Sequence, residues 1–106
     1  MKMDTLLSKH KIRYEFVATV WLYAPPGGWH FVSLPKETAK EIRDQLGWQE
    51  EGWGRLRAVA TIGKTQWDTA IWFDAKQNTY LLPLKSIIRK KEHIKAGQTL
   101  TIAVWI

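Results

Sequence analysis

The chain has 106 residues, of which 45% are hydrophobic and none is cysteine, and its formal net charge is +6. These values are typical of one folded domain spanning residues 1–106, and they exclude disulfides, thiolate catalysis and thiolate metal ligation. The sequence has no signal-peptide core and no apolar run of membrane length, so we expect a cytoplasmic protein without a membrane partner.

Residues 14–34 predict two strands separated by a loop. Aromatic and β-branched residues dominate residues 14–23, which we expect to form one continuous strand. Residues 24–28 contain two prolines and two glycines and are expected to form a turn or loop. Residues 29–34 then return as the second strand of a hairpin.

Residues 36–46 predict a helix of about three turns. Pro35 precedes them and suits the first helical position, where its missing N–H costs nothing. Gly47 suits the C-terminal cap. One stripe of this helix is apolar, at Ala39, Ile42 and Leu46. The helix is therefore expected to pack along one side only.

A tight hairpin is predicted for residues 55–73. Gly63 followed by Lys64 suits a two-residue type II′ turn. That turn places Ile62 opposite Thr65 and determines every other pair along the two strands.

This register assigns the two faces of the hairpin. Trp67 lies opposite Ala60 on the face expected to be core. Arg55 lies opposite Trp72 on the outer face, where the two side chains can form a cation–π pair, and Val59 shares that face. A slip of one residue would bury the arginines of the outer face, so the register is strongly specified.

The last third of the chain predicts a strand, a brief helix and a strand. The first strand covers residues 79–84 and the helix residues 86–93, with Ile87 and Ile88 facing inward. Residues 99–106 alternate between apolar and polar side chains, as in a half-buried strand.

Two parts of the chain resemble each other. Residues 31–36 match residues 80–85, and each stretch contains a proline and is followed by a helix, a glycine and a strand. Duplicated units of this kind commonly close a small barrel. We therefore expect a mostly β domain with two short helices.

The ordered motifs of the chain also resemble a known family. They are Trp29, Phe31, Val32, Leu34 and Pro35, then residues 57–62, Trp67, and residues 80–85 with Arg89 and Gly97. They are similar to a bacterial and archaeal family of domains of unknown function, numbered nineteen-oh-five. The resemblance implies a double-split (pseudo-twofold) β-barrel capped by two short helices, an architecture that AbrB-like regulators and antitoxins build from two chains. It further implies a barrel complete in one chain, hence a monomer or a weak dimer, and it brings no catalytic residue.

Seven tryptophans are unusually many for a domain of this size. Trp21, Trp29 and Trp67 lie within apolar alternation and are expected in the core, since aromatic side chains can fill a small barrel.

Trp48 and Trp53 lie in a predicted loop and leave two interpretations open. They either plug one end of the barrel or form a stacking platform for a ligand. We favour the plug, because two exposed loop tryptophans would be costly. The platform, together with Arg55, is an alternative small-molecule pocket.

Basic residues concentrate in residues 1–13, expected to be a polar and partly flexible N-terminal segment, and in residues 85–95. The second segment contains Lys85, Arg89, Lys90 and Lys91. Nucleic-acid binding through these two segments is one alternative, because such clusters can contact phosphates. We favour a solvated face, since no array of base-reading side chains accompanies the segment.

No catalytic constellation is recognised. His10, His30 and His93 stand apart, without carboxylates spaced for a metal, and no nucleophile elbow or phosphate-binding glycine loop is present. We expect no cofactor and no enzymatic activity. The preferred hypothesis is a soluble binding or accessory module with an unknown partner.

Overall fold

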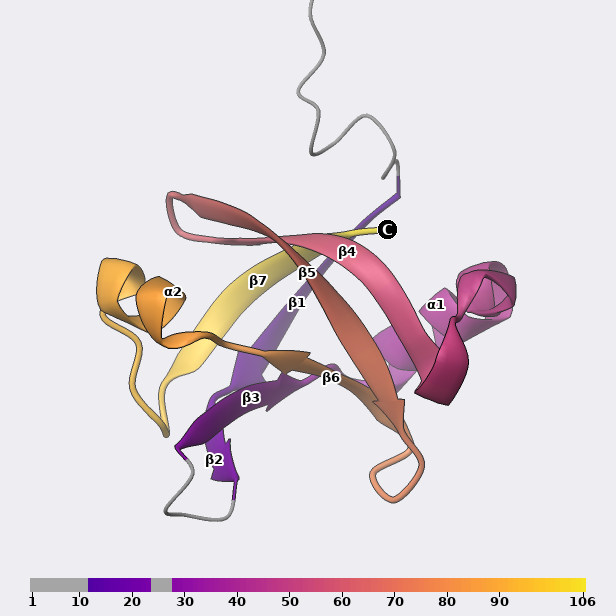
Figure 1. The fold of residues 1–106 in the computed structure, drawn as a ribbon, viewed down its shortest axis with the longest axis horizontal. Coiled ribbons are helices and arrows are strands. Elements are labelled where there is room, and N and C mark those ends of the chain that lie inside the picture. The colour runs from indigo at the N-terminus through magenta and orange to yellow at the C-terminus, as the bar shows by residue number, and fades with distance from the viewer. Residues whose placement is uncertain (1–11, 24–27) are drawn as a thin grey trace, which may run out of the picture.

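The computed structural model describes residues 12–23 and 28–106. The predictions for residues 1–11, and for most of the loop at residues 24–28, lie outside the described residues. The described residues form a mostly β domain of seven antiparallel strands with two α-helices and two short 3₁₀ turns (Figure 1). The strands are β1 (Arg13–Thr19), β2 (Trp21–Tyr23), β3 (Trp29–Ser33), β4 (Arg55–Ile62), β5 (Thr65–Asp74), β6 (Thr79–Pro83) and β7 (Thr99–Trp105). The helices are α1 (Lys36–Leu46), η1 (Gly47–Gln49), η2 (Gly52–Gly54) and α2 (Ser86–Glu92).

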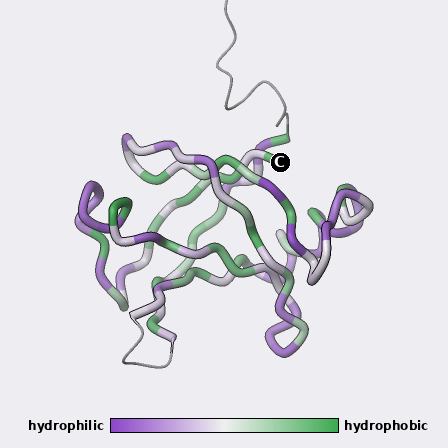
Figure 2. Tube along the Cα trace, viewed as in Figure 1, coloured by the Kyte–Doolittle hydropathy of each residue, from purple (hydrophilic) through white to green (hydrophobic). Residues whose placement is uncertain are grey.

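The strands form one sheet in the order β1-β7-β4-β5-β6-β3-β2. The consecutive strands β1 and β2 lie at opposite ends of this order, so the sheet curls into a half-barrel that brings its ends together (Figure 1). Hydrophobic residues run along the strands, and hydrophilic residues gather in the β5–β6 turn and around α2 (Figure 2). In the described part of the chain, no helix has both the length and the apolar character needed to cross a membrane.

The expected single strand at residues 14–23 is two strands, and the break falls at Val20. The Val20 amide donates to the Gln98 carbonyl over 2.8 Å, and its carbonyl accepts from the Gly97 amide at the same distance. The next residue, Trp21, instead pairs with Phe31 of β3. The chain thus changes its neighbour from β7 to β3, a long-range event that residue alternation does not reveal.

The β4–β5 hairpin confirms the predicted register. Ile62 pairs with Thr65, and Arg55 pairs with Trp72, whose ring centre lies 5.6 Å from the Arg55 guanidinium carbon. Val59 was expected on the outer face but is fully buried. It pairs with Trp105 of β7, so a large side chain on the same face covers it.

Helix α1 confirms the predicted bounds, and its apolar stripe is buried. Pro35 is the residue before the helix rather than its first residue, because its ψ of 145° is extended. In α2, Ile88 is buried but Ile87 is exposed, so the expectation that both face inward is wrong for Ile87. Adjacent residues are about 100° apart around a helix, and this short helix buries a single narrow stripe.

Strands β3 and β6 are related reciprocally. The Leu34 amide donates to the Tyr80 carbonyl over 3.0 Å, and the Leu84 amide donates to the His30 carbonyl over 2.9 Å. A helix begins two residues after each leucine. Leu34 and Leu84 therefore occupy equivalent places in the structure. This structural alignment is shifted by one residue from the sequence match between residues 31–36 and 80–85.

Candidate functional site

The two loop tryptophans do not plug the half-barrel. Trp48 is 80% exposed and Trp53 is 94% exposed, so the favoured prediction for them is wrong. The Trp48 indole donates to the Gln45 carbonyl over 3.2 Å, which holds the ring outside the sheet. Arg55 forms an ion pair with Glu51 at 2.8 Å. None of the three cavities described below is lined by these tryptophans or Arg55.

Glu50, from the same loop, points inward instead. Its side chain is only 14% exposed, forms an ion pair with Arg43 at 3.2 Å and accepts a hydrogen bond from the Tyr80 hydroxyl. The Arg43 guanidinium also lies 3.7 Å from the ring centre of Phe73. Burial raises the pKa of Tyr80 well above its usual value, and the bond to Glu50 adds to the effect. These groups join the loop to the sheet.

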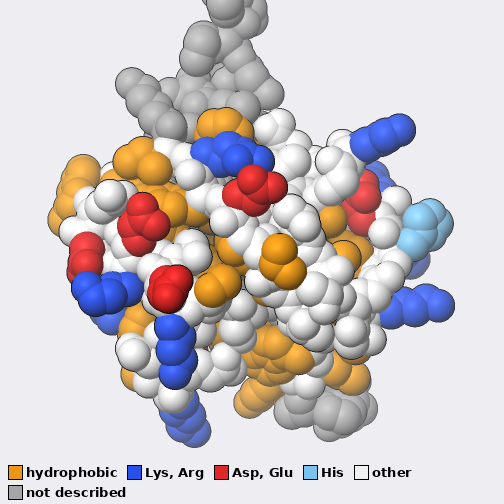
Figure 3. All heavy atoms as spheres, turned by 180° about the vertical axis from the view of Figure 1, so that it is seen from behind, with side chains coloured by type: hydrophobic (Ala, Val, Ile, Leu, Met, Phe, Trp, Pro, Cys, Tyr) orange, Lys and Arg blue, Asp and Glu red, His pale blue; other side chains and the backbone are white. Residues whose placement is uncertain are grey.

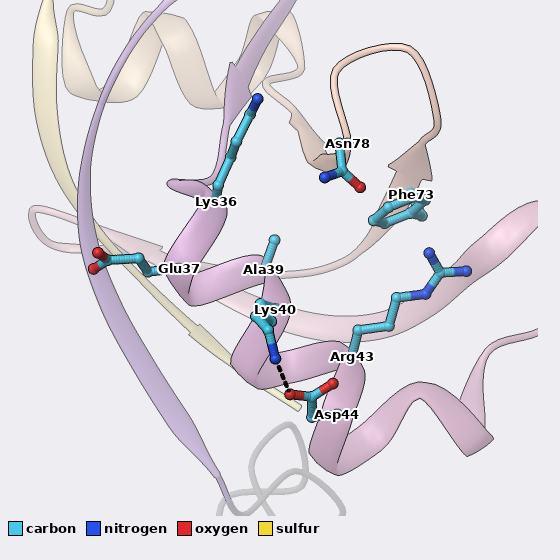
Figure 4. Close-up of a pocket in the computed structure, with 8 residues that line it drawn as sticks. All are labelled: Lys36, Glu37, Ala39, Lys40, Arg43, Asp44, Phe73 and Asn78. Carbon is cyan, nitrogen blue, oxygen red and sulfur yellow. Dashed lines mark hydrogen bonds and ion pairs between the residues drawn. The ribbon is translucent and has the colours of Figure 1, made fainter.

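A shallow cavity of about 390 Å³ lies beside this network, between α1 and the β5–β6 turn (Figure 4). Arg43 reaches across it toward Phe73, and Asn78 faces them from the turn. Lys40 donates to Asp44 over 2.8 Å along the helix surface. The charges along this cavity are mixed and partly paired, and they suggest no defined ligand.

The predicted basic segment forms α2 and its flanks. Lys85, Lys90 and Lys91 are exposed, whereas the Arg89 side chain is half-buried and donates to the Leu84 carbonyl over 3.1 Å. Lys85 and Arg89 line one cavity of about 240 Å³, and Trp29 lines the same cavity.

The one acid of the basic segment, Glu92, faces the β4–β5 turn. It accepts a hydrogen bond from the Thr65 hydroxyl over 2.6 Å and another from the Lys64 amide over 3.3 Å. Its carboxylate is therefore held against the β4–β5 turn. In the view from behind, Lys and Arg side chains project from the side of the molecule that carries α2 (Figure 3).

The sequence prediction missed a cluster of aromatic side chains on the β2–β3 hairpin. Trp21 pairs with Phe31 and Tyr23 with Trp29, so all four side chains emerge on one face. The rings of Trp21 and Phe31 lie 5.2 Å apart, and those of Trp29 and Phe31 lie 6.3 Å apart and nearly parallel, at 12°. Hydrophobic side chains gather at the bottom of Figure 3, where Figure 1 places these strands.

This cluster contradicts the core prediction for two of its members. Trp29 is 59% exposed and Trp21 is half-buried, whereas Trp67 is buried as expected. The reason is the face of the sheet: Trp29 lies on the opposite face of β3 from the fully buried Val32, and Trp21 pairs with Phe31 on that same outward face. The sequence did contain a signal for this cluster, namely aromatic residues at alternate positions on both sides of a Pro/Gly loop.

The aromatic cluster forms one wall of a groove of about 780 Å³, which we call the aromatic groove. The residues that define it are Trp21, Tyr23, Trp29 and Phe31 on the hairpin, Leu81, and residues 74–77 of the β5–β6 turn.

Hydrogen bonds connect the two walls of the aromatic groove. The Trp21 indole donates to the Ser33 hydroxyl over 3.0 Å, and that hydroxyl donates to the Gln77 side-chain oxygen over 2.7 Å. Trp29 lines both the aromatic groove and the cavity beside α2. Trp29 therefore borders both hollows.

Within the described part of the chain, His30 and His93 form no metal site. His30 Nδ1 lies 2.7 Å from the Gly28 carbonyl oxygen, and His93 has a φ of 57° at the end of α2. His10 lies outside the described residues. Residues 12–23 and 28–106 contain no group of His, Cys, Asp and Glu side chains that could hold a metal ion.

The chain is thus a mostly β domain, a curled sheet with two short helices and an open aromatic groove. It matches the family model described as a domain of unknown function (DUF1905) over residues 16–104, and it belongs to that family. No curated protein matches the chain.

Proposed function

We propose that this protein is a soluble, cytoplasmic, non-catalytic binding module whose ligand lies in the aromatic groove. The observation that carries the proposal is the exposure of the ring cluster: Tyr23 and Trp29 are mostly exposed although both lie in strands. Contiguous exposed apolar surface on a folded domain usually marks an interaction site. Flat ligands gain binding energy by stacking on such rings.

The titratable groups support binding rather than catalysis. Glu50 is engaged by Arg43 and Tyr80, and Glu92 by Thr65, so these carboxylates have structural partners. The groove itself offers Asp74 and Lys76, which no hydrogen bond or ion pair joins into a general acid–base pair in the described residues.

We also propose that the half-barrel is one form of the double-split β-barrel, produced by duplication of a strand–helix–strand unit within one chain. The reciprocal bonds of Leu34 and Leu84 support this twofold relationship. On this proposal the two units complete the fold without a second chain.

Nuclear magnetic resonance of the indole N–H groups tests the binding site. The probes are adenosine, as a flat aromatic ring, and cellohexaose, as a flat sugar chain. We expect at least one of them to shift the indole signals of Trp21 and Trp29 in a saturable manner. Trp48 and Trp53 are matched controls, because they are more exposed but lie outside the groove. Shifts at Trp48 and Trp53 alone, or no shift with either probe, would refute the proposed site.

A further inference from the structure

We infer that the ligand of the aromatic groove is a single-stranded nucleic acid, an inference that rests on the proposed function. Proteins that bind single strands combine aromatic side chains, on which bases stack, with cations placed along the phosphate backbone. The groove and its surroundings contain both components.

The stacking component is centred on Trp29. Its ring is nearly parallel to that of Phe31, and more than half of its surface is exposed. Phe31 is further braced by Trp21 at 5.2 Å and by Tyr23 at 6.4 Å. The supporting rings limit the motion of Trp29, so a base that stacks on its open face meets a preorganised surface.

Cations line both hollows that Trp29 borders. Lys76 lies on the wall of the groove that faces the hairpin, and Lys85 and Arg89 line the cavity beside α2. A strand that stacks a base on Trp29 can therefore place its flanking phosphates near the cations of both hollows. Glu92 lines neither hollow, and Asp74 is the one acid among the described residues that line them.

The polar groups of the groove suit the edges of unpaired bases. Gln77 and Asp74 line it on the wall opposite the rings. The Gln77 amide nitrogen can donate to a base edge while its oxygen accepts from Ser33, and the Asp74 carboxylate can accept from an exocyclic amine or from a ring N–H such as that of thymine. From the sequence we favoured a solvated face for residues 85–95, because that segment has no base-reading side chains of its own. In this inference Gln77 and Asp74 of the groove take that role.

The arrangement favours a single strand over a nucleic-acid duplex and over a neutral sugar chain. A duplex buries the faces of its bases in the stack, so the rings of the groove could not reach them. A neutral sugar chain could stack on the rings, but it would leave Lys76, Lys85 and Arg89 without a counter-charge.

The test measures fluorescence anisotropy of a labelled oligothymidylate of about ten nucleotides, which is within the usual site size of a single-strand binder. The full chain is used, and a labelled duplex of equal length is measured in parallel. We expect tighter binding of the single strand. We also expect log K to fall with log salt with a slope of about −2, since three cations each release about 0.7 counterion.

Two pairs of variants separate the contribution of stacking from that of the cations. Trp29→Ala should weaken binding about fivefold or more, the effect of losing one stacked base, whereas Trp48→Ala should leave it unchanged. Lys85→Gln should reduce the salt slope by about 0.7, whereas Lys40→Gln, on the surface of α1, should not. All four substitutions are at exposed side chains, so the fold should persist, as circular dichroism can verify.

The outcomes distinguish this inference from the proposed function. If the oligonucleotide binds and Trp29→Ala weakens it, both stand. If cellohexaose shifts the groove indoles but the oligonucleotide does not bind, the groove binds a ligand and the inference is wrong. Equal loss of affinity in Trp48→Ala and Trp29→Ala, or preference for the duplex, would also overturn it.

Discussion

The Tyr80 hydroxyl donates a hydrogen bond to the Glu50 carboxylate, and this contact joins β6 to the loop that precedes β4. Tyr80 is fully buried, and Glu50 also carries the ion pair with Arg43. Although its two tryptophans are exposed, the loop is thus anchored to the sheet by an acid.

Replacement of Tyr80 by Phe should destabilise the domain by about 1–2 kcal/mol, because it leaves a mostly buried carboxylate without one donor. Urea denaturation gives the free energy of unfolding. Tyr23→Phe is the matched control, since Tyr23 is exposed, and its effect should stay below about 0.5 kcal/mol. Equal stability of Tyr80→Phe and the wild type would show that the contact contributes nothing.

The same tyrosine predicts a loss of stability at high pH. Burial raises the pKa of Tyr80 above its usual 10.0. The folded state therefore keeps a proton that the unfolded state releases, so the contribution is complete below about pH 10 and is lost as the pH rises further. We expect the free energy of unfolding to fall above pH 10 by up to about 1.4 kcal/mol per pH unit for this group.

Tyr80→Phe should make that decline shallower, whereas Tyr23→Phe should not alter it. Part of the decline should remain, because the pKa of Tyr14 is also raised, chiefly by burial and secondly by the charge of Glu41. An identical decline in Tyr80→Phe and the wild type would assign the effect to other groups.

Gly63 is required where the β4–β5 turn meets α2. Its φ is +56°, and a side chain at this position would collide with the Glu92 carboxylate. Gly63→Ala should therefore cost about 1–3 kcal/mol through backbone strain and displacement of Glu92. Gly52→Ala is the control, because nothing lies within 4 Å of its added carbon. A similar urea midpoint for both variants would contradict this account.

Local chemistry explains what the sequence predicted well. The Gly63–Lys64 turn sets the register of the eight residue pairs in the hairpin. The apolar stripe of residues 36–46 predicts helix α1. Both depend on neighbours within a few residues, where turn chemistry and helical periodicity act.

The aromatic groove depends on strand order, which those local rules do not contain. Trp29 and Trp67 both lie in apolar, aromatic-rich strands, yet Trp67 points into the core, whereas Trp29 lies on the face of β3 opposite the buried Val32. Similarly, the loop residue that points inward, Glu50, is identified by its contact with Tyr80, which is 30 residues away in the sequence.

The domain should be a monomer whose fold is complete in one chain. β7 pairs with both β1 and β4 of the same chain. The seven described strands therefore form one continuous sheet without a strand from a second molecule. Sedimentation equilibrium at micromolar concentration should give the mass of one chain. An intertwined dimer that exchanges β7 would contradict the prediction, whereas weak association through the exposed ring cluster would not.

Trp67 provides the most direct test of the core. It is buried and lies opposite Ala60, in the third pair from the hairpin turn, so Trp67→Ala should cost about 3–5 kcal/mol, as large aromatic deletions from cores do.

Trp67→Phe should cost much less. In the described residues the Trp67 indole nitrogen is buried without a hydrogen-bond partner. Phe removes this unsatisfied donor, which offsets part of the loss of packing. Urea denaturation of both variants, with Trp53→Ala as the exposed control, measures the difference. If Trp67→Phe were as destabilising as Trp67→Ala, the indole nitrogen would have a partner and the packing at this position would differ from the one described.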